Sequence, residues 1–222
     1  RATELAVEKF NVDVVVLDDG FQHRSLHRDL DFVMIDDTRS LRHRLLLPAG
    51  LMREPLSSLR RAHVLVRSSY TSANVEEYKH VTSAPVINVH RMPKALISLS
   101  GSNTQLLSDV RGRTCVAFCG IGNPQAFRST LDEIQVHVNE FLIYRDHHLY
   151  SPKDIRNIET RAEMLSAELV ITTEKDAVRL RSLLTTSSLL STHCYFLQIE
   201  LAVIDGSEVL ADKIDEVMRK VA

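Results

Sequence analysis

The 222-residue sequence predicts an α/β fold, and two observations support this prediction. The run Val12–Leu17 is rich in β-branched residues, which is typical of a strand buried in a parallel sheet. Farther along the chain, short apolar runs alternate with helix-like stretches, the pattern of βαβ units. We therefore expect a mainly parallel sheet with helices between its strands.

The first half of the chain contains more predicted strands than predicted helices. The stretch Ser98–Arg113 is polar and contains glycine and serine, so we interpret it as a link between domains. We therefore expect one domain at residues 1–110 and a second at residues 111–222. The expected elements of the first part are a helix over Ala2–Lys9 and strands over Val12–Leu17, Asp31–Ile35, His63–Arg67, Val86–Val89 and Ala95–Leu99.

The second half of the chain alternates between strands and helices. Asn123 and Pro124 are residue types preferred as a helix cap and at the first helical position, so a helix should follow them and end near Ile134. The other expected elements are strands over Thr114–Cys119, Val136–Ile143, Leu169–Thr172 and Tyr195–Leu201, and helices over Ser151–Ser166, Glu174–Leu184 and Glu208–Val221.

The composition is that of an ordinary globular protein, with 44% hydrophobic and 25% charged residues. The net charge of −2 creates no overall field that would favour nucleic acid. The chain's 3 cysteines are too few for a disulfide framework and indicate a reducing, cytosolic environment. No signal peptide or long apolar run is present. Because the sequence begins with Arg1 rather than methionine, we expect that its N-terminus is not the natural start.

Two adjacent carboxylates follow the predicted strand Val12–Leu17, in the segment DDGFQHR that begins at Asp18 and Asp19. Ligands of open α/β sheets bind at the carboxyl ends of the strands. Mg²⁺ prefers one or two carboxylates together with water and phosphate oxygens, so this pair suits Mg²⁺. A plain turn after a strand explains the same residues equally well.

Arginine is concentrated between Thr38 and Asn74, a stretch with one acid, Glu54, and no lysine. Arginine binds phosphate in a bidentate manner, whereas lysine acts as a point charge, so this excess favours an anionic partner. A solvated basic surface would have the same composition. The loop Leu46–Pro55 is apolar, contains an Arg–Glu pair that we expect to be buried, and suits the edge of a lipid layer. The arginines are Arg39, Arg42, Arg44, Arg53, Arg60, Arg61 and Arg67.

Two further motifs follow predicted strands in the second half. In Asp146-His147-His148 the aspartate can orient a histidine for acid–base work, although a capped turn or a metal pair fits the same residues. The segment Thr172–Ala177 begins a predicted helix, whose unpaired N–H groups and Lys175 favour an anion. An ordinary capped helix is the alternative there. The turn Gly120–Pro124 is only half of a dinucleotide fingerprint.

The order of these motifs is more specific than any one of them. In series, DDGFQHR, LLPAG-LMREP, GIGNPQAF, DHH and TTEKDAVRL resemble the tetraacyldisaccharide 4'-kinase family over roughly Val12–Leu201. The resemblance implies a P-loop-type (Rossmann-like) parallel-sheet domain and a smaller C-terminal α/β domain. It also implies ATP-dependent phosphorylation of the 4'-hydroxyl of a lipid A disaccharide precursor, a tetraacyldisaccharide 1-phosphate. This reaction would take place at the cytoplasmic face of the bacterial inner membrane, in peripheral contact with it.

The resemblance also implies roles for individual residues. Asp18 and Asp19 match the Walker B-type pair that serves Mg²⁺ and ATP. Asp146 and His147 match the family's Asp-His near the reaction centre, and we expect His147 to have the catalytic role. A motif expected to close over the nucleotide is matched by Thr173, Glu174, Lys175 and Asp176. The candidate contacts to the lipid substrate are Gln22, His23, Arg44 and Arg53.

The sequence departs from the family pattern at its start. It contains no G-x-x-x-x-G-K-[ST] P-loop, no Gly-Asp-Glu segment with the family's catalytic aspartate, and no membrane-associating N-terminal segment. Because phosphoryl transfer depends on positioning and charge stabilisation, we expect the 222 residues alone to be inactive. Two alternatives stay open. One is a metal-dependent phosphoesterase built on residues 146–148 and the Asp18–Asp19 pair, and the other is a non-catalytic module that binds anionic lipid through the arginines.

Overall fold

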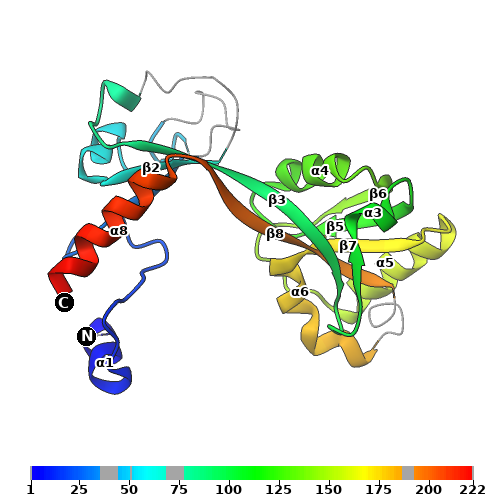
Figure 1. The fold of residues 1–222 in the computed structure, drawn as a ribbon. Coiled ribbons are helices and arrows are strands. Elements are labelled where there is room, and N and C mark those ends of the chain that lie inside the picture. Colours follow the sequence, from blue (N-terminus) through cyan, green and yellow to red (C-terminus); the bar gives the residue numbers. More distant parts are fainter. Residues whose placement is uncertain (1, 36–44, 51, 69–77, 187–192, 222) are drawn as a thin grey trace. The chain divides into compact units, whose positions relative to one another are not determined.

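The computed structural model describes residues 2–35, 45–50, 52–68, 78–186 and 193–221, which form two compact units (Figure 1). Unit 1 comprises Arg1–His90 and Leu201–Ala222, and unit 2 comprises Arg91–Glu200. The chain leaves unit 1 within the long strand β3 (Val86–Ser98) and returns to it within β8 (Cys194–Asp205).

This division differs from the expected boundary near residue 110. The stretch Ser98–Arg113, expected to be a link, instead contains β4 (Thr104–Leu106) and the short helix α3 (Leu107–Val110) inside unit 2. Strand β4 pairs antiparallel with the end of β3, and the polar residues between them close a hairpin. The two short strands expected at 86–89 and 95–99 are therefore parts of one strand.

Unit 2 contains a mostly parallel sheet covered by helices on both faces. Strands β5 (Thr114–Cys119), β6 (His137–Ile143) and β7 (Leu169–Thr173) pair in parallel with one another or with β8, in the order β6-β5-β7-β8. The helices are α4 (Pro124–Glu133), α5 (Pro152–Met164), α6 (Glu174–Leu180) and the 3-10 helix η3 (Arg181–Thr186). Helices α3 and α4 lie on one side of this sheet, and α5 and α6 lie on the other (Figure 1).

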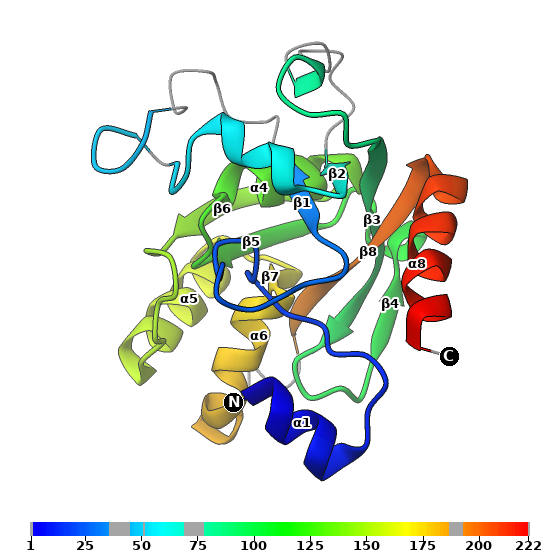
Figure 2. The same cartoon turned by 90° about the vertical axis from the view of Figure 1, so that its left-hand side faces the viewer.

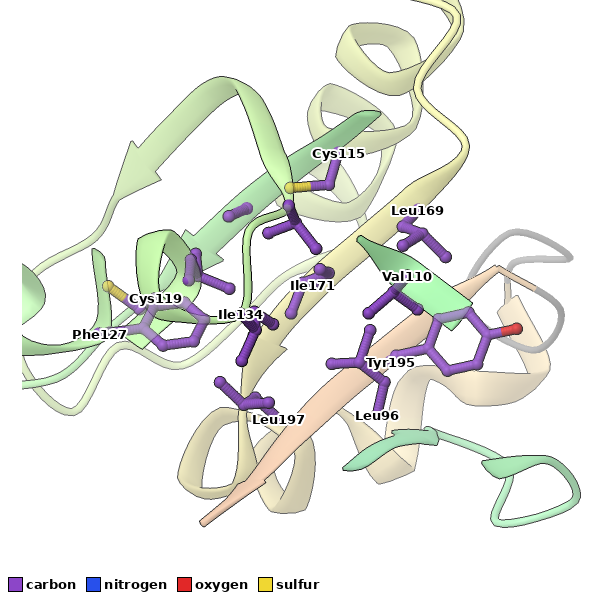
Figure 3. Close-up of a cluster of buried hydrophobic side chains, with 13 residues drawn as sticks. Leu96, Val110, Cys115, Cys119, Phe127, Ile134, Leu169, Ile171, Tyr195 and Leu197 are labelled. Carbon is purple, nitrogen blue, oxygen red and sulfur yellow. The ribbon is translucent and has the colours of Figure 1, made fainter. Parts of the chain in front are cut away.

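The core of unit 2 follows from the alternation of side chains along β5. Cys115, Ala117 and Cys119 point to the face covered by α3 and α4, where Phe127 and Leu131 pack. Figure 3 shows Cys115, Cys119 and Phe127 in this cluster. The intervening residues Val116 and Phe118 point to the opposite face and pack against α5 and α6. A strand buried on both faces is apolar at every position, which explains the continuous run that predicted it.

Unit 1 contains a smaller parallel sheet of β1 (Phe32–Ile35), β2 (Val64–Arg67) and the first part of β3. The C-terminal helix α8 (Ser207–Val221) lies along one face (Figure 2). Val209 and Leu210 of this helix pack against a cluster of buried valine and isoleucine side chains. The opposite face packs against the 3-10 helix η2 (Leu56–Arg61) through Leu59. Helix α1 (Ala2–Phe10) begins the chain.

The expected buried strand Val12–Leu17 is not formed, and this prediction is wrong for the structure. The segment has no regular secondary structure, and Val16 is 89% exposed. Val14 and Leu17 are exposed as well. A strand needs a hydrogen-bonding neighbour, and among the described residues none pairs with this segment.

The remaining predicted helices and strands are confirmed to within a few residues, including the cap of α4, where the Asn123 side chain accepts the Ala126 N–H at 3.2 Å. The predicted helix Glu174–Leu184 is divided into α6 and η3. Within the described part of the chain, no helix is both long enough and apolar enough to cross a membrane.

Candidate functional sites

The first candidate site is the loop DDGFQHR of unit 1. Asp18 and Asp19 form a tight turn in which Asp19 adopts a positive φ of 51°. At Gly20 a Cβ atom would lie 2.8 Å from Cβ of Leu17, so the turn requires glycine there. Both carboxylates are consequently presented to solvent.

Two arginines hold the rest of this loop in place. Arg28 donates to the carbonyls of His23 at 2.6 Å and Leu26 at 3.0 Å, and its Nε pairs with Asp31 Oδ1 at 2.7 Å. The Arg61 guanidinium lies 4.6 Å from the centre of the Phe21 ring, a cation–π distance. The loop is thus anchored along its length by Arg28, which the sequence interpretation did not single out, and by Arg61, which it had named only as a possible anion contact.

Arg53 brings together residues that the sequence predicted separately. Its Nη1 donates to Asp19 Oδ2 at 2.8 Å and to the Gln22 side-chain oxygen at 3.1 Å. The expected buried Arg53–Glu54 pair is not formed, because Glu54 pairs with Arg61 at 2.7 Å. The hydrogen bond from Arg61 is the main cause that lowers the pKa of Glu54.

His23 and Arg44 are the other residues that we expected to contact the lipid. The His23 ring lies 3.4 Å from the Ser25 hydroxyl, and no contact joins it to Arg53. Arg44 lies outside the described residues, as do Arg39 and Arg42.

The two aspartates of the loop differ in what they can bind. Asp19 is already paired with Arg53, whereas Asp18 is exposed and has no hydrogen-bond or ion-pair partner among the described residues. A small set of carboxylates with open positions for water and phosphate is the donor set that Mg²⁺ prefers. The loop therefore fits Mg²⁺, with Asp18 as the more available ligand.

The second candidate site lies in unit 2, where the carboxyl ends of β5, β6 and β7 meet at one edge of the sheet. Gly120 follows β5, Asp146 and His147 follow β6, and Thr173 ends β7 and caps α6 through the Asp176 N–H. This edge is where open α/β sheets bind ligands. Two motifs that are far apart in the sequence, DHH and TTEKDAVRL, are neighbours here.

Asp176 is the buried centre of this second site. Its side chain is fully buried and accepts hydrogen bonds from the Gly120 N–H at 3.0 Å and the Thr173 hydroxyl at 2.7 Å. Arg179 pairs with it at 2.9 Å. These contacts occupy the carboxylate and favour a structural role for Asp176 over the nucleotide contact that we expected. Glu174 and Lys175, by contrast, are exposed at the start of α6.

The two histidines of the DHH motif have different environments. His147 is 82% exposed, and its Nδ1 lies 3.2 Å from Arg179 Nη2. His148 stacks on Tyr144 with ring centroids 4.7 Å apart, and its Nε2 lies 3.2 Å from Asp154. Only His147 therefore faces a potential ligand.

Asp154 belongs to the support of His148. It forms a capping box with Ser151 at the start of α5. Burial raises the pKa of Asp154, but the hydrogen bonds from Ser151 and His148 outweigh burial and keep it below its usual value. The pair of histidines does not act as a unit, and no group of three or more potential metal ligands occurs in the described part of the chain.

Comparison with known proteins places the chain among one set of relatives. A family model described as "Tetraacyldisaccharide-1-P 4'-kinase" (LpxK) matches residues 1–219. The tetraacyldisaccharide 4'-kinase of Syntrophus aciditrophicus is 38% identical over 212 residues, which cover 89% of this chain and 56% of that protein. The corresponding protein of Halothermothrix orenii is 35% identical and is covered to 51%.

A solved structure supports the same relationship. LpxK from Aquifex aeolicus, described as an "apo" form in complex with ATP, is 30% identical, with a TM-score of 0.67. The match covers 96% of this chain and 60% of that one. The chain thus spans about half to three fifths of the length of these relatives.

Sequence reasoning missed Arg179 and Arg28. Arg179 lies three residues after Asp176 in a predicted helix, a spacing that allows an ion pair on one helix face. Arg28 lies three residues before Asp31 and pairs with it. Charge spacing gave a signal for both pairs, but it gave none for the carbonyl oxygens that each arginine also binds.

Proposed function

Because the chain belongs to the tetraacyldisaccharide-1-P 4'-kinase family, we propose that it forms part of an enzyme that transfers the γ-phosphoryl group of ATP to the 4'-hydroxyl of a tetraacyldisaccharide 1-phosphate. The observation that carries the proposal is the family match over residues 1–219. It is supported by the folded DDGFQHR loop, in which Asp19 and Gln22 meet Arg53.

In unit 1, Asp18 and Asp19 would hold Mg²⁺, which neutralises the charge on the phosphate oxygens of ATP when bound. Asp18 offers an exposed carboxylate, and Arg53 fixes the direction of Asp19. The remaining donors of Arg53, together with Gln22 and His23, would bind the anionic head of the lipid. A guanidinium has five N–H groups, so Arg53 can keep Asp19 and still bind a phosphate.

In unit 2, His147 and Asp146 would act on the reacting groups. Gly122 favours this placement, because a Cβ atom there would lie 3.1 Å from Asp146 Oδ2 and would crowd the carboxylate. Thr173, Glu174 and Lys175 begin α6 at the same edge of the sheet, and Lys175 would add positive charge near an anionic nucleotide.

The apolar loop of unit 1 supports peripheral contact with a membrane. Leu45, Leu46 and Leu47 are 59%, 45% and 60% exposed, an unusual concentration of large apolar side chains in one loop. Arg53 lies a few residues farther along the same loop. These leucines support contact with a lipid layer, where the substrate would present its head group, and the family resemblance implies that this layer is the cytoplasmic face of the inner membrane.

The test uses a chimera in which the N-terminal portion of the Syntrophus aciditrophicus relative precedes this chain. Transfer of labelled phosphate from ATP to tetraacyldisaccharide 1-phosphate in mixed micelles should require both Mg²⁺ and Asp18. Asp29→Ala is the matched control, because Asp29 is an exposed aspartate of the same segment with no partner among the described residues. An active chimera in which Asp18→Ala behaves like Asp29→Ala would contradict the Mg²⁺ assignment.

The alternative functions receive less support. A phosphoesterase using both histidines as metal ligands would need them to converge, yet His148 is occupied by Asp154 and the Tyr144 ring. If the chain releases phosphate from the lipid when Mg²⁺ or Mn²⁺ is present and ATP is absent, the phosphoesterase alternative would be supported again. Binding to anionic vesicles that survives loss of Asp18, Asp19 and His147 would favour the non-catalytic lipid module.

A further inference from the structure

Arg179 links the buried Asp176 of unit 2 to His147, an exposed side chain of the candidate site. Its Nη1 donates to Asp176 Oδ1 at 2.9 Å and to the Gly120 carbonyl at 3.0 Å. Its Nη2 lies 3.2 Å from His147 Nδ1. The guanidinium is planar, so the contacts of Nη1 fix the direction in which Nη2 points.

The backbone of His147 is fixed by the same carbonyl group. The His147 N–H donates to the Gly120 carbonyl at 3.1 Å and to Asp146 Oδ1 at 2.9 Å. His147 also adopts a positive φ of 58°, a conformation that few non-glycine residues adopt. The Gly120 carbonyl oxygen therefore accepts hydrogen bonds from both the His147 main chain and the Arg179 side chain, and it holds the two next to each other.

The contact between the two side chains determines where the imidazole proton resides. Arginine has only hydrogen-bond donors, so His147 Nδ1 must be the acceptor and carry no proton. The proton of the neutral ring is then on Nε2. Nε2 lies 3.8 Å from Asp146 Oδ2, too far for a hydrogen bond, so this N–H is available to a ligand.

We propose that Arg179 is a positioning residue that holds His147 as its Nε2–H tautomer, so that His147 donates a hydrogen bond to an acceptor oxygen in the reaction instead of removing a proton. This inference rests on the proposed function for its catalytic consequence. The tautomer itself depends only on the geometry of unit 2. It changes the expected acid–base role of His147, because a nitrogen that already carries a proton cannot act as a base.

The tautomer is measured on the whole 222-residue chain, labelled with ¹⁵N-histidine, by long-range ¹H–¹⁵N spectra. The signals of His147 are identified by their loss in His147→Gln. Wild-type His147 should show a pyridine-type Nδ1 and a pyrrole-type Nε2. His137 is the internal reference, because it is exposed and its imidazole has no hydrogen-bond or ion-pair partner among the described residues.

Arg179→Lys separates the ion pair from the control of the tautomer. Lysine keeps a positive charge beside Asp176 but cannot contact Asp176, Gly120 and His147 together. In this variant the ring ¹⁵N chemical shifts of His147 should move toward those of the reference His137, which we expect to be averaged over the two tautomers. Arg161→Lys is the matched control, because Arg161 joins Glu140 to α5 without contacting a histidine, and it should leave the His147 shifts unchanged.

The catalytic consequence is measured in the chimera. Arg179→Lys should lower kcat on the order of 10- to 100-fold, as expected for a misplaced reacting group, and leave the KM for ATP unchanged. His147 shifts that are the same in wild type and Arg179→Lys would overturn the proposal, as would full turnover of that variant. An inactive chimera with the expected shifts would contradict the proposed function while supporting the tautomer.

Discussion

The carboxylate of Asp176 accepts the backbone N–H of Gly120 at 3.0 Å, which ties the end of β5 to the first turn of α6. The two residues are far apart in the sequence, and each belongs to a different predicted motif. This single contact sets the distance between the loop after β5 and the helix that bears Arg179.

Replacing Asp176 by alanine should destabilise unit 2 by roughly 3–5 kcal/mol, because it leaves the partly buried Arg179 charge and the Gly120 N–H without their partner. Hydrogen exchange of the β5 and β7 amides, analysed as free energy of opening, measures this change in unit 2 alone. Asp132→Ala is the control, since Asp132 forms an exposed pair with Arg128 that should contribute about 0–1 kcal/mol. Equal effects of the two substitutions would refute the structural role of Asp176.

The two adjacent histidines should give opposite results when each is replaced by alanine. His148→Ala removes the stacking on Tyr144 and the contact with Asp154, so it should destabilise unit 2 by about 1–3 kcal/mol. His147→Ala should change stability by only about 0.5 kcal/mol, because its side chain is exposed. In the chimera, His147→Ala should still lower kcat. The assignment is reversed if His148→Ala is fully stable and inactive.

Arg53→Met should raise the KM of the chimera for the lipid while changing stability little. The Arg53–Asp19 pair is exposed, so its loss should cost no more than about 1 kcal/mol in unfolding by denaturant. A lost charge-assisted contact to the lipid is worth about 1.5–3 kcal/mol, or roughly 10- to 150-fold in KM. Arg60→Met is the matched control, since Arg60 is exposed in the same segment, and among the described residues its side chain hydrogen-bonds only to the Val81 carbonyl, at 3.4 Å. An unchanged KM in Arg53→Met would leave the loop as a basic surface only.

The three cysteine thiols should be unreactive in the folded chain at pH 8, and all should react after unfolding. Burial raises the pKa of Cys119 to about 11 and that of Cys115 to about 12, and it raises the pKa of Cys194 as well. Because these folded-state pKa values lie above the ordinary thiol value, the buried thiols are un-ionised at neutral pH, and the stability that their burial contributes is fully present there. It is lost progressively as the pH rises from the ordinary thiol pKa of 9.0 to the folded-state pKa.

A colorimetric thiol reagent, added before and after denaturation, measures the reactivity. Rapid modification of Cys119 in the native chain would show that the β5 core opens easily. The loss of stability between about pH 9 and pH 11 should be accompanied by the appearance of reactive thiols, which gives a second check on the same burial.

The sequence by itself determined most of the elements of unit 2, because these depend on local chemistry, but it missed β4 and α3. Asn123 caps α4, Ser151 and Asp154 form the capping box of α5, and the apolar run of β5 fits a strand covered on both faces. The candidate loop DDGFQHR was also evident, since its acids and glycine are adjacent in the chain.

Only the tertiary structure decided which of these residues act together. A similar run at Val12–Leu17 forms no strand and leaves Val14, Val16 and Leu17 exposed, because hydrogen bonds from neighbouring strands, and not β-propensity, decide whether a strand forms. Arg53 meets Asp19 and Gln22 from a distant loop, whereas parallel strands that end at one edge of a sheet bring Gly120 and His147 to Arg179. Local pattern specifies where a helix or strand begins, whereas the contacts of a charged side chain depend on the packing of the elements around it.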